Sequence, residues 1–280
     1  MSMTKADYPV IYLRPPHGWS ALKLGDLWHY RELVYFMTLR DIKVRYKQAV
    51  LGVSWALIQP ILTMIIFTVI FGNLAKMPTD NGIPYPLFSL AAIIPWQLFA
   101  NALQRSTLSL AGNANLLTKV YFPRLIIPVS AVMAALVDFC FSLLVMAGMM
   151  IYYRYPPTLE ILWLPLLILL ALLTALAVGL WLSALNVQYR DVQHMVPFLV
   201  QIWMYASPVV YSSSLIPNGI WRYIYGLNPI TGVVNGFRWA LLGGPPPDTM
   251  FLISVVAVFL LLGSGLFYFR RMERNFADLV

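Results

Sequence analysis

The sequence predicts an all-α polytopic membrane protein with six transmembrane helices. Two observations on composition lead to this fold class. Of the 280 residues, 60% are hydrophobic and only 11% are charged, whereas soluble domains carry roughly 45–50% apolar and about 25% charged residues. The mean hydropathy is +0.73. A third observation is that long apolar segments separate the charged residues. A soluble enzyme, a disordered chain and a disulfide-rich secreted module are therefore excluded.

Six apolar segments are long enough to cross a membrane, since a spanning helix needs about 20 apolar residues. The second and fifth contain Pro95, Pro197 and Pro208, which are expected to interrupt them. These spans form a transmembrane domain over residues 49–280, after a cytoplasmic N-terminal segment of residues 1–48. The six spans cover residues 53–73, 86–110, 125–153, 161–185, 195–211 and 249–269.

The distribution of basic residues predicts that both termini lie in the cytoplasm. Six spans put both termini on one side, and that side holds 15 of the 19 lysine and arginine residues. Cytoplasmic loops of membrane proteins are enriched in these two residues. The formal net charge of +8 therefore indicates orientation in the cytoplasmic (inner) membrane, not binding to nucleic acid.

Residues 26–48 predict an amphipathic helix along the cytoplasmic membrane interface. One apolar stripe has helical spacing, a weaker stripe lies beside it, and basic residues fill the remaining faces. The alternative is a solvated helix that contributes only to orientation. The main stripe is Trp28, Tyr35, Leu39, Ile42 and Tyr46, the weaker stripe is Leu33, Met37 and Val44, and the basic residues are Arg40, Lys43, Arg45 and Lys47.

Between the last two spans, residues 212–248 predict two short re-entrant or interfacial helices on the outer side. The apolar pieces 220–227 and 230–242 are each too short to span, and prolines and glycines separate them. Backbone at membrane depth must be covered by protein or line a cavity. The alternative is a surface loop that carries two interfacial tryptophans, Trp221 and Trp239.

Motifs typical of catalytic and metal sites are missing. The sequence has no phosphate-binding loop and no Gly-Lys dipeptide, so it predicts no ATP site of that kind. The three histidines are far apart and there is one cysteine, which leaves no credible set of metal ligands. No Gly-x-Ser-x-Gly nucleophile turn occurs. The sequence disfavours an enzyme and predicts no cofactor in this chain.

Asp138 is the only acidic residue deep within a predicted span. A charge at this depth costs about 2.5–3.5 kcal/mol on insertion scales, so it needs a partner. Pairing with Arg105 or with a backbone donor is favoured over a direct role at the substrate or in a gate. A carrier driven by protons or sodium would show several such groups.

Aromatic residues make up 14% of the chain, and most fall near predicted span ends, as in the aromatic belts of membrane proteins. A few in the first and fifth spans are candidates for lining a transport path, because flat rings stack on the apolar faces of sugars. Ordinary packing is the alternative for each. The candidates are Trp55, Phe67, Phe71, Trp203, Tyr205 and Tyr211.

Several short motifs follow one another along the chain. The first is the run Arg40-Asp41-Ile42-Lys43-Val44-Arg45-Tyr46-Lys47, then Leu51-Gly52, Trp55 and Gln59-Pro60. The others are Tyr30-Arg31-Glu32-Leu33, Asn115-Leu116-Leu117, Tyr121-Phe122-Pro123-Arg124, Asn186-Val187, Tyr189-Arg190-Asp191, Ser207-Pro208-Val209, Leu227-Asn228-Pro229 and Gly236-Phe237-Arg238. Together, over about residues 8–270, they resemble the membrane (permease) subunit of ABC-2-type polysaccharide exporters, the O-antigen and teichoic-acid export permeases.

This resemblance implies half of a transporter that has no energy source of its own. Two copies of the subunit would pair with two copies of a separate ATPase subunit, which holds the ATP and Mg²⁺, and would enclose a channel. Residues 112–124 would form a coupling helix against the ATPase, and residues 215–245 a periplasmic gate. The residues expected to couple to the ATPase are Arg40, Asp41, Asn113, Asn115, Lys119, Tyr121 and Arg124.

The resemblance also implies the substrate, an undecaprenyl-pyrophosphate-linked polysaccharide such as O-antigen. Its pyrophosphate is expected near Lys43, Arg45 and Lys47, where each basic group contributes about 1 kcal/mol toward anionic lipid. Attraction to ordinary headgroups explains the same cluster. Two alternatives stay open: an ABC-2 exporter of a small molecule or lipid, and a membrane-embedded glycosyltransferase or ligase that uses Asp80, Glu160 and Asp248 with Arg222 or Arg238.

Overall fold

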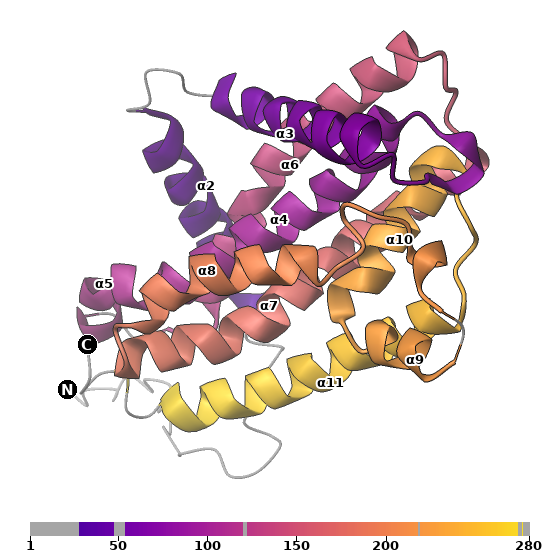
Figure 1. The fold of residues 1–280 in the computed structure, drawn as a ribbon. Coiled ribbons are helices and arrows are strands. Elements are labelled where there is room, and N and C mark those ends of the chain that lie inside the picture. The colour runs from indigo at the N-terminus through magenta and orange to yellow at the C-terminus, as the bar shows by residue number, and fades with distance from the viewer. Residues whose placement is uncertain (1–27, 48–53, 120–121, 218, 274–275, 277–280) are drawn as a thin grey trace, which may run out of the picture.

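The computed structural model describes residues 28–47, 54–119, 122–217, 219–273 and 276. Within these ranges the regular structure is helical and contains no strand (Figure 1), as the sequence predicts. The α-helices are α2 (Arg31–Lys47), α3 (Ser54–Phe67), α4 (Tyr85–Gly112), α5 (Ala114–Lys119), α6 (Ile126–Tyr152), α7 (Leu164–Gln188), α8 (Val192–Tyr205), α9 (Ile220–Gly226), α10 (Pro229–Leu242) and α11 (Thr249–Met272). A π-helix, η2 (Thr68–Leu74), and the short helices η3 (Asp80–Gly82), η4 (Leu159–Trp163) and η5 (Ser213–Leu215) complete the fold.

Five helical segments among the described residues are long and apolar enough to cross a membrane. They coincide with the first, second, third, fourth and sixth predicted spans, with bounds that differ by a few residues. The chain is thus a multi-pass membrane protein. The segments are Ser54–Leu74, Tyr85–Gly112, Ile126–Tyr152, Leu159–Gln188 and Thr249–Met272.

The fifth predicted span, over residues 195–211, is interrupted near Pro208, as the sequence predicts. Helix α8 ends at Tyr205 after 14 residues. This corresponds to about 21 Å at a rise of 1.5 Å per residue, less than the ~30 Å of a hydrocarbon core. Pro208 has no N–H to donate and disfavours helical backbone at Ser207, so turns follow the helix. A sixth crossing by this segment stays a prediction.

Two other prolines do not interrupt their helices, contrary to the prediction. Helix α4 continues through Pro95 and α8 continues through Pro197. In membrane proteins, neighbouring helices and local adjustments satisfy the backbone groups that a proline frees. Pro95 is buried among such neighbours, and its position inside the bundle explains why the helix persists.

Helix α4 is the central helix of the bundle (Figure 1). In its most apolar 18-residue stretch, 83% of the residues are buried, compared with 17% for the first span and 28% for α11. It packs against α3, α6, α7, α8 and α10. Polar side chains on α4 therefore meet other helices rather than lipid.

The two short helices predicted between residues 215 and 245 are present as α9 and α10. They differ strongly in burial. Twelve of the 14 residues of α10 are buried, and the helix packs against α4, α7 and α11. Helix α9 carries exposed apolar residues such as Ile220 and Trp221. The surface-loop alternative is therefore wrong for residues 229–242, which belong to the core.

Helix α2 packs on α6, through the weaker of the two predicted stripes. Met37 is buried, and Leu33 packs with it in an apolar cluster that includes Leu125 and Ile126 at the start of α6. On the main stripe, Trp28 and Tyr35 are exposed, at 74% and 60%. The helix is consequently part of the folded bundle. Trp28 and Tyr35 at its start face away from the bundle, whereas Leu39, Ile42 and Tyr46 further along the main stripe are half-buried.

Different short helices lie at the two ends of the bundle. Helix α5 lies at one end, and α9 and α10 lie toward the other (Figure 1). We call them the α5 end and the α9 end.

Gly265 allows α11 to approach α7 closely. A Cβ atom at this position would lie 2.6 Å from the backbone oxygen of Ala177, and backbone cannot move aside as a flexible side chain can. We expect Gly265→Ala to lower the free energy of unfolding by about 1–3 kcal/mol, as for overpacked cores, in denaturant unfolding of the purified protein. Gly263→Ala is the control, since nothing lies within 4 Å of its Cβ. Equal effects of the two substitutions would contradict the packing argument.

Candidate functional site

The carboxylate of Asp138 on α6 joins three helices. Its Oδ2 accepts hydrogen bonds from Arg105 Nη2 on α4 at 2.6 Å and from Arg45 Nη1 on α2 at 2.5 Å. The Tyr46 hydroxyl donates to Oδ1. The predicted pairing with Arg105 is confirmed. The contacts with Arg45 and Tyr46 were not predicted, because these residues are more than 90 positions away in the sequence.

This group of four side chains, the Asp138 cluster, is positively charged overall. Two guanidinium groups share one carboxylate, which leaves one excess positive charge. Burial, followed by the hydrogen bond to Asp138, raises the pKa of Tyr46 above its ordinary value. The hydrogen bond from this hydroxyl therefore contributes fully to the free energy of unfolding below the ordinary tyrosine pKa of about 10. The contribution is lost at higher pH, as the phenol ionises in the folded protein.

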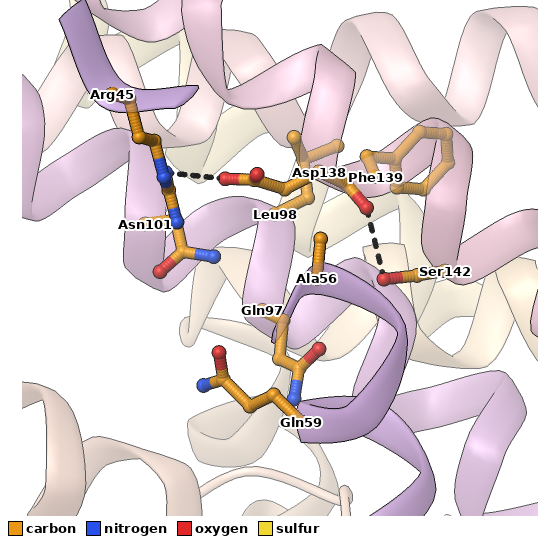
Figure 2. A pocket seen from close by; sticks show the side chains of 9 residues that line it. All are labelled: Arg45, Ala56, Gln59, Gln97, Leu98, Asn101, Asp138, Phe139 and Ser142. Carbon is orange, nitrogen blue, oxygen red and sulfur yellow. Dashed lines mark hydrogen bonds and ion pairs between the residues drawn. The ribbon is translucent and has the colours of Figure 1, made fainter. Parts of the chain in front are cut away.

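A polar pocket opens beside the Asp138 cluster (Figure 2). Its cavity volume is about 10 Å³, room for about one water molecule. The amide groups of Gln59, Gln97 and Asn101 gather around this space, with Arg45 and Asp138 at one side. Helices α2, α3, α4 and α6 all contribute to its walls. The remaining lining residues are Ala56, Leu98, Phe139 and Ser142.

The three predicted headgroup residues on α2 are in different environments. Lys43 and Lys47 are exposed, as an interaction with lipid requires. Arg45 instead turns to Asp138 and lines the polar pocket. Near the middle of the helix, Arg40 Nη2 pairs with Asp41 Oδ1 at 2.8 Å.

The predicted coupling helix over residues 112–124 is shorter than expected. Helix α5 spans Ala114–Lys119, and residues 122–124 are not helical. Before its start, Asn113 ends α4 with non-helical backbone, and its side chain donates to the Ser109 carbonyl at 2.8 Å. Asn115 and Lys119 are exposed, whereas Tyr121 lies outside the described residues. Arg124 is half-buried, donates to the Glu273 carbonyl and lies 6.0 Å from the centre of the Phe276 ring.

The aromatic candidates of the first span do not share one environment. Trp55 is 51% exposed, whereas Phe67 is buried in the main core. Phe71 is half-buried and meets Phe67 edge to face at 5.6 Å. Trp55 is therefore the most exposed of the three.

The candidates near α8 divide in the same way. Tyr205 is 54% exposed. The ring of Trp203 meets Phe99 at 5.1 Å, and its Nε1 donates to the Asn228 side chain at 2.9 Å. Asn228 is the N-cap of α10 and also donates to Ser207 Oγ at 2.9 Å. Trp203 therefore anchors the end of α8 to the start of α10.

Arg238 on α10 has a structural role that the sequence did not predict. It is 2% exposed, and it donates to the carbonyls of Val209 and Tyr211 at 2.9 and 3.1 Å. The hydroxyl of Tyr85 donates to the intervening Val210 carbonyl at 2.7 Å. The turn after α8, which includes the sixth aromatic candidate, Tyr211, is thus held by side chains of α10 and α4.

The guanidinium of Arg238 also lies over the ring of Phe88, with Cζ 3.7 Å from the ring centre. Burial lowers the pKa of Arg238 to about 9, so the group remains charged at neutral pH. Its contacts are backbone carbonyls and an aromatic face, which suit a buried cation. The sequence signal that points to it is a single arginine within an otherwise apolar helix.

Four of the five residues of the glycosyltransferase alternative make structural contacts. Arg222 pairs with Asp248, which caps α11. Arg238 holds the turn described above. Asp80 accepts hydrogen bonds from Ser212 and Ser214. These contacts give no support to a shared catalytic centre.

Comparisons with known proteins agree on one kind of membrane protein. A family model described as "ABC-2 type transporter" matches residues 32–242. The chain is 31% identical to an O-antigen export system permease protein RfbA from Myxococcus xanthus, covering 89% of this chain and 96% of that protein. It is 28% identical to a protein of the same name from Klebsiella pneumoniae, covering 89% and 95%. It is 26% identical to the polysialic acid transport protein KpsM from Escherichia coli, covering 74% and 80%.

Proposed function

The chain belongs to the ABC-2 type transporter family, and from this premise we propose that it is the membrane subunit of an ATP-driven exporter of a lipid-linked polysaccharide such as O-antigen. The observation that carries the proposal is the likeness to O-antigen export permeases over 89% of the chain. The likeness to a polysialic acid transport protein, a second protein named for a polysaccharide, supports the same substrate class.

A separate ATPase subunit supplies the energy in this proposal. The sequence has no phosphate-binding loop, so ATP and Mg²⁺ are bound by the partner. The α5 end faces the cytoplasm and the ATPase, an orientation supported by the excess of lysine and arginine predicted for that side. Asn115 and Lys119 on α5 contact the ATPase, and Asn113 sets the direction in which α5 leaves α4.

Two copies of the chain form the transport path. Helix α3 is the least buried of the spans, at 17%, and it carries the exposed Trp55. Tyr205 is exposed on α8. In the proposed dimer these helices turn toward the path, where aromatic rings stack on sugars. At the α9 end, α9 and α10 gate the outer side, with the turn held by Arg238 as its hinge.

The lipid end of the substrate approaches along α2. Lys43 and Lys47 are exposed there and attract its pyrophosphate, each by about 1 kcal/mol. Arg45 stands between this surface and the polar pocket. The polysaccharide then passes from the cytoplasmic side to the outer face.

Reconstitution tests this function directly. The chain is purified with its ATPase subunit, placed in proteoliposomes and supplied with ATP and lipid-linked polysaccharide. We expect the polysaccharide to stimulate ATP hydrolysis and to become accessible on the far side of the membrane. A complex with a hydrolysis-deficient ATPase subunit is the control and should transport nothing.

Two results would contradict the proposal. Transport by this chain without the ATPase would remove the need for an external energy source. Stimulation by a small amphiphile or free lipid, with no response to polysaccharide, would favour the small-molecule exporter instead.

A further inference from the structure

Two residues that follow α11, Glu273 and Phe276, contact the segment that follows α5. Phe276 is fully buried, and its ring meets that of Phe269 on α11 edge to face at 5.4 Å. The guanidinium of Arg124 lies 6.0 Å from the centre of the Phe276 ring, within the range of a cation–π interaction. We call Glu273 and Phe276 the C-terminal anchor.

A hydrogen bond from a charged group adds a second contact. Arg124 Nη1 donates to the backbone carbonyl of Glu273, the C-cap residue of α11. The side chain of Glu273 is itself held by Arg270, whose Nη1 lies 2.7 Å from Glu273 Oε2. Carbonyls at the end of a helix lack partners within the helix and attract cations. Arg124 is therefore bound to the C-terminal anchor through both its charge and its hydrogen-bond donors.

Helix α5 and the C-terminal anchor share one apolar core. Phe276 belongs to a cluster of buried side chains that also contains Leu117 of α5 and Phe122. Leu117 is 5% exposed, whereas Asn115 and Lys119 on the same helix are exposed. Helix α5 thus buries one side in this cluster and presents polar side chains on the other.

The segment that contains α5 is held on both sides. Before the helix, the side chain of Asn113 donates to the Ser109 carbonyl on α4. After it, Arg124 is bound to the C-terminal anchor. The helix between them has only six residues, and helices shorter than about 12 residues are not stable alone. The orientation of α5 therefore depends on these attachments and on the burial of Leu117.

We propose that the C-terminal anchor positions α5 for its contact with the ATPase subunit. Arg124 and Phe276 are positioning residues that act through α5, and Arg124 makes no contact of its own with the ATPase. This inference rests on the proposed function for its partner, and it adds the element that holds the contact surface in place. A fixed α5 transmits movement of the ATPase to the spans, whereas a loosened α5 absorbs part of that movement.

Hydrogen exchange of the purified full chain in micelles tests the positioning. Phe276→Leu keeps an apolar side chain but removes the aromatic face, and Arg124→Gln removes the charge. Each should speed amide exchange in α5 about tenfold, from the loss of one contact with a charged group. Exchange in α4 and α6 should stay within about twofold of the wild type. Phe267→Leu and Arg271→Gln are the matched controls, because both residues are exposed.

Transport by the reconstituted complex tests the consequence for coupling. The same variants are assembled with the ATPase subunit in proteoliposomes, and the ratio of polysaccharide transported to ATP hydrolysed is measured. We expect this ratio to fall about threefold for Phe276→Leu and for Arg124→Gln and to stay unchanged for the two controls. A simple loss of folded protein would lower transport and hydrolysis together and leave the ratio unchanged.

The double variant shows whether the two residues act as one unit. If they do, the combination of Arg124→Gln with Phe276→Leu should lower the ratio no further than the larger of the single effects. Effects that multiply would show that Arg124 acts on the ATPase independently of Phe276, and they would overturn the positioning role.

The remaining outcomes separate this inference from the proposed function. Unchanged exchange in α5 would overturn the inference and leave the proposed function intact. Faster exchange throughout the bundle would also overturn it, because the substitutions would then destabilise the whole fold. If the wild-type complex hydrolyses ATP without transport, the proposed function fails, and exchange in α5 still decides whether the C-terminal anchor holds this helix.

Discussion

Asp138→Asn is expected to lower the free energy of unfolding by about 3 kcal/mol, the lower end of the range for removing one member of a buried ion pair. The substitution keeps the shape of the side chain and removes its charge. Arg105 and Arg45, which both bind Oδ2, would then face each other without a carboxylate. We use the lower end because the side chain of Arg45 is 37% exposed, so solvent screens the interaction between Arg45 and Asp138.

The effect should be measured by denaturant unfolding of the purified protein in micelles. Adding Arg45→Gln to Asp138→Asn should restore part of the stability, because it removes one of the two unpaired cations. Asp41→Asn is the control: its pair with Arg40 is partly exposed and joins neighbouring residues, so the cost should be about 0–1 kcal/mol. If the double variant is as unstable as the sum of the single ones, the two arginines do not interact through Asp138.

Arg238→Met is expected to lower the free energy of unfolding by about 3 kcal/mol. Methionine fills much of the volume but donates nothing. The carbonyls of Val209 and Tyr211 would each lose a donor, at about 1–3 kcal/mol for each buried group. Arg238 is 2% exposed, so the wild type pays a desolvation penalty for its buried charge. The methionine variant does not, which offsets part of the cost.

A graded series separates the charge of Arg238 from its geometry. Arg238→Lys retains the charge but not the planar guanidinium group, so we expect it to donate to only one of the two carbonyls. Its free energy of unfolding should lie between those of the wild type and of Arg238→Met. Arg190→Met is the control, since Arg190 is exposed just after α7. The same denaturant unfolding measures all three variants. A lysine variant as unstable as the methionine variant would show that charge contributes nothing at this position.

Much of the fold could be predicted from sequence because the membrane imposes a simple rule. A spanning helix must satisfy its own backbone and be apolar for about 20 residues, so five spans were located to within a few residues. This rule does not predict which groups in the folded bundle replace a backbone hydrogen bond that a proline removes. Pro95 was therefore predicted to break α4 and does not, whereas Pro208 does follow the end of α8.

The candidate site was predicted only in part, for the same reason. Asp138 stood out as a lone acid, and Arg105 was a reasonable partner because the two belong to neighbouring spans. Arg45 was assigned to lipid from its basic neighbours, yet it lies in the Asp138 cluster. Gln59, Gln97 and Asn101 were not predicted as site residues, since single amides in apolar segments do not form a recognisable sequence motif.

The sequence by itself determined that this chain lies in the membrane, where most of its spans begin and end, and that Asp138 requires a partner. These follow from composition and local spacing, which the free energy of transfer into lipid makes decisive. Only the tertiary structure decided which arginines reach Asp138, which amides share one pocket, and that Arg238 holds a turn 27 residues before it in the chain. Such contacts join residues distant in sequence, and their energies depend on how the helices pack.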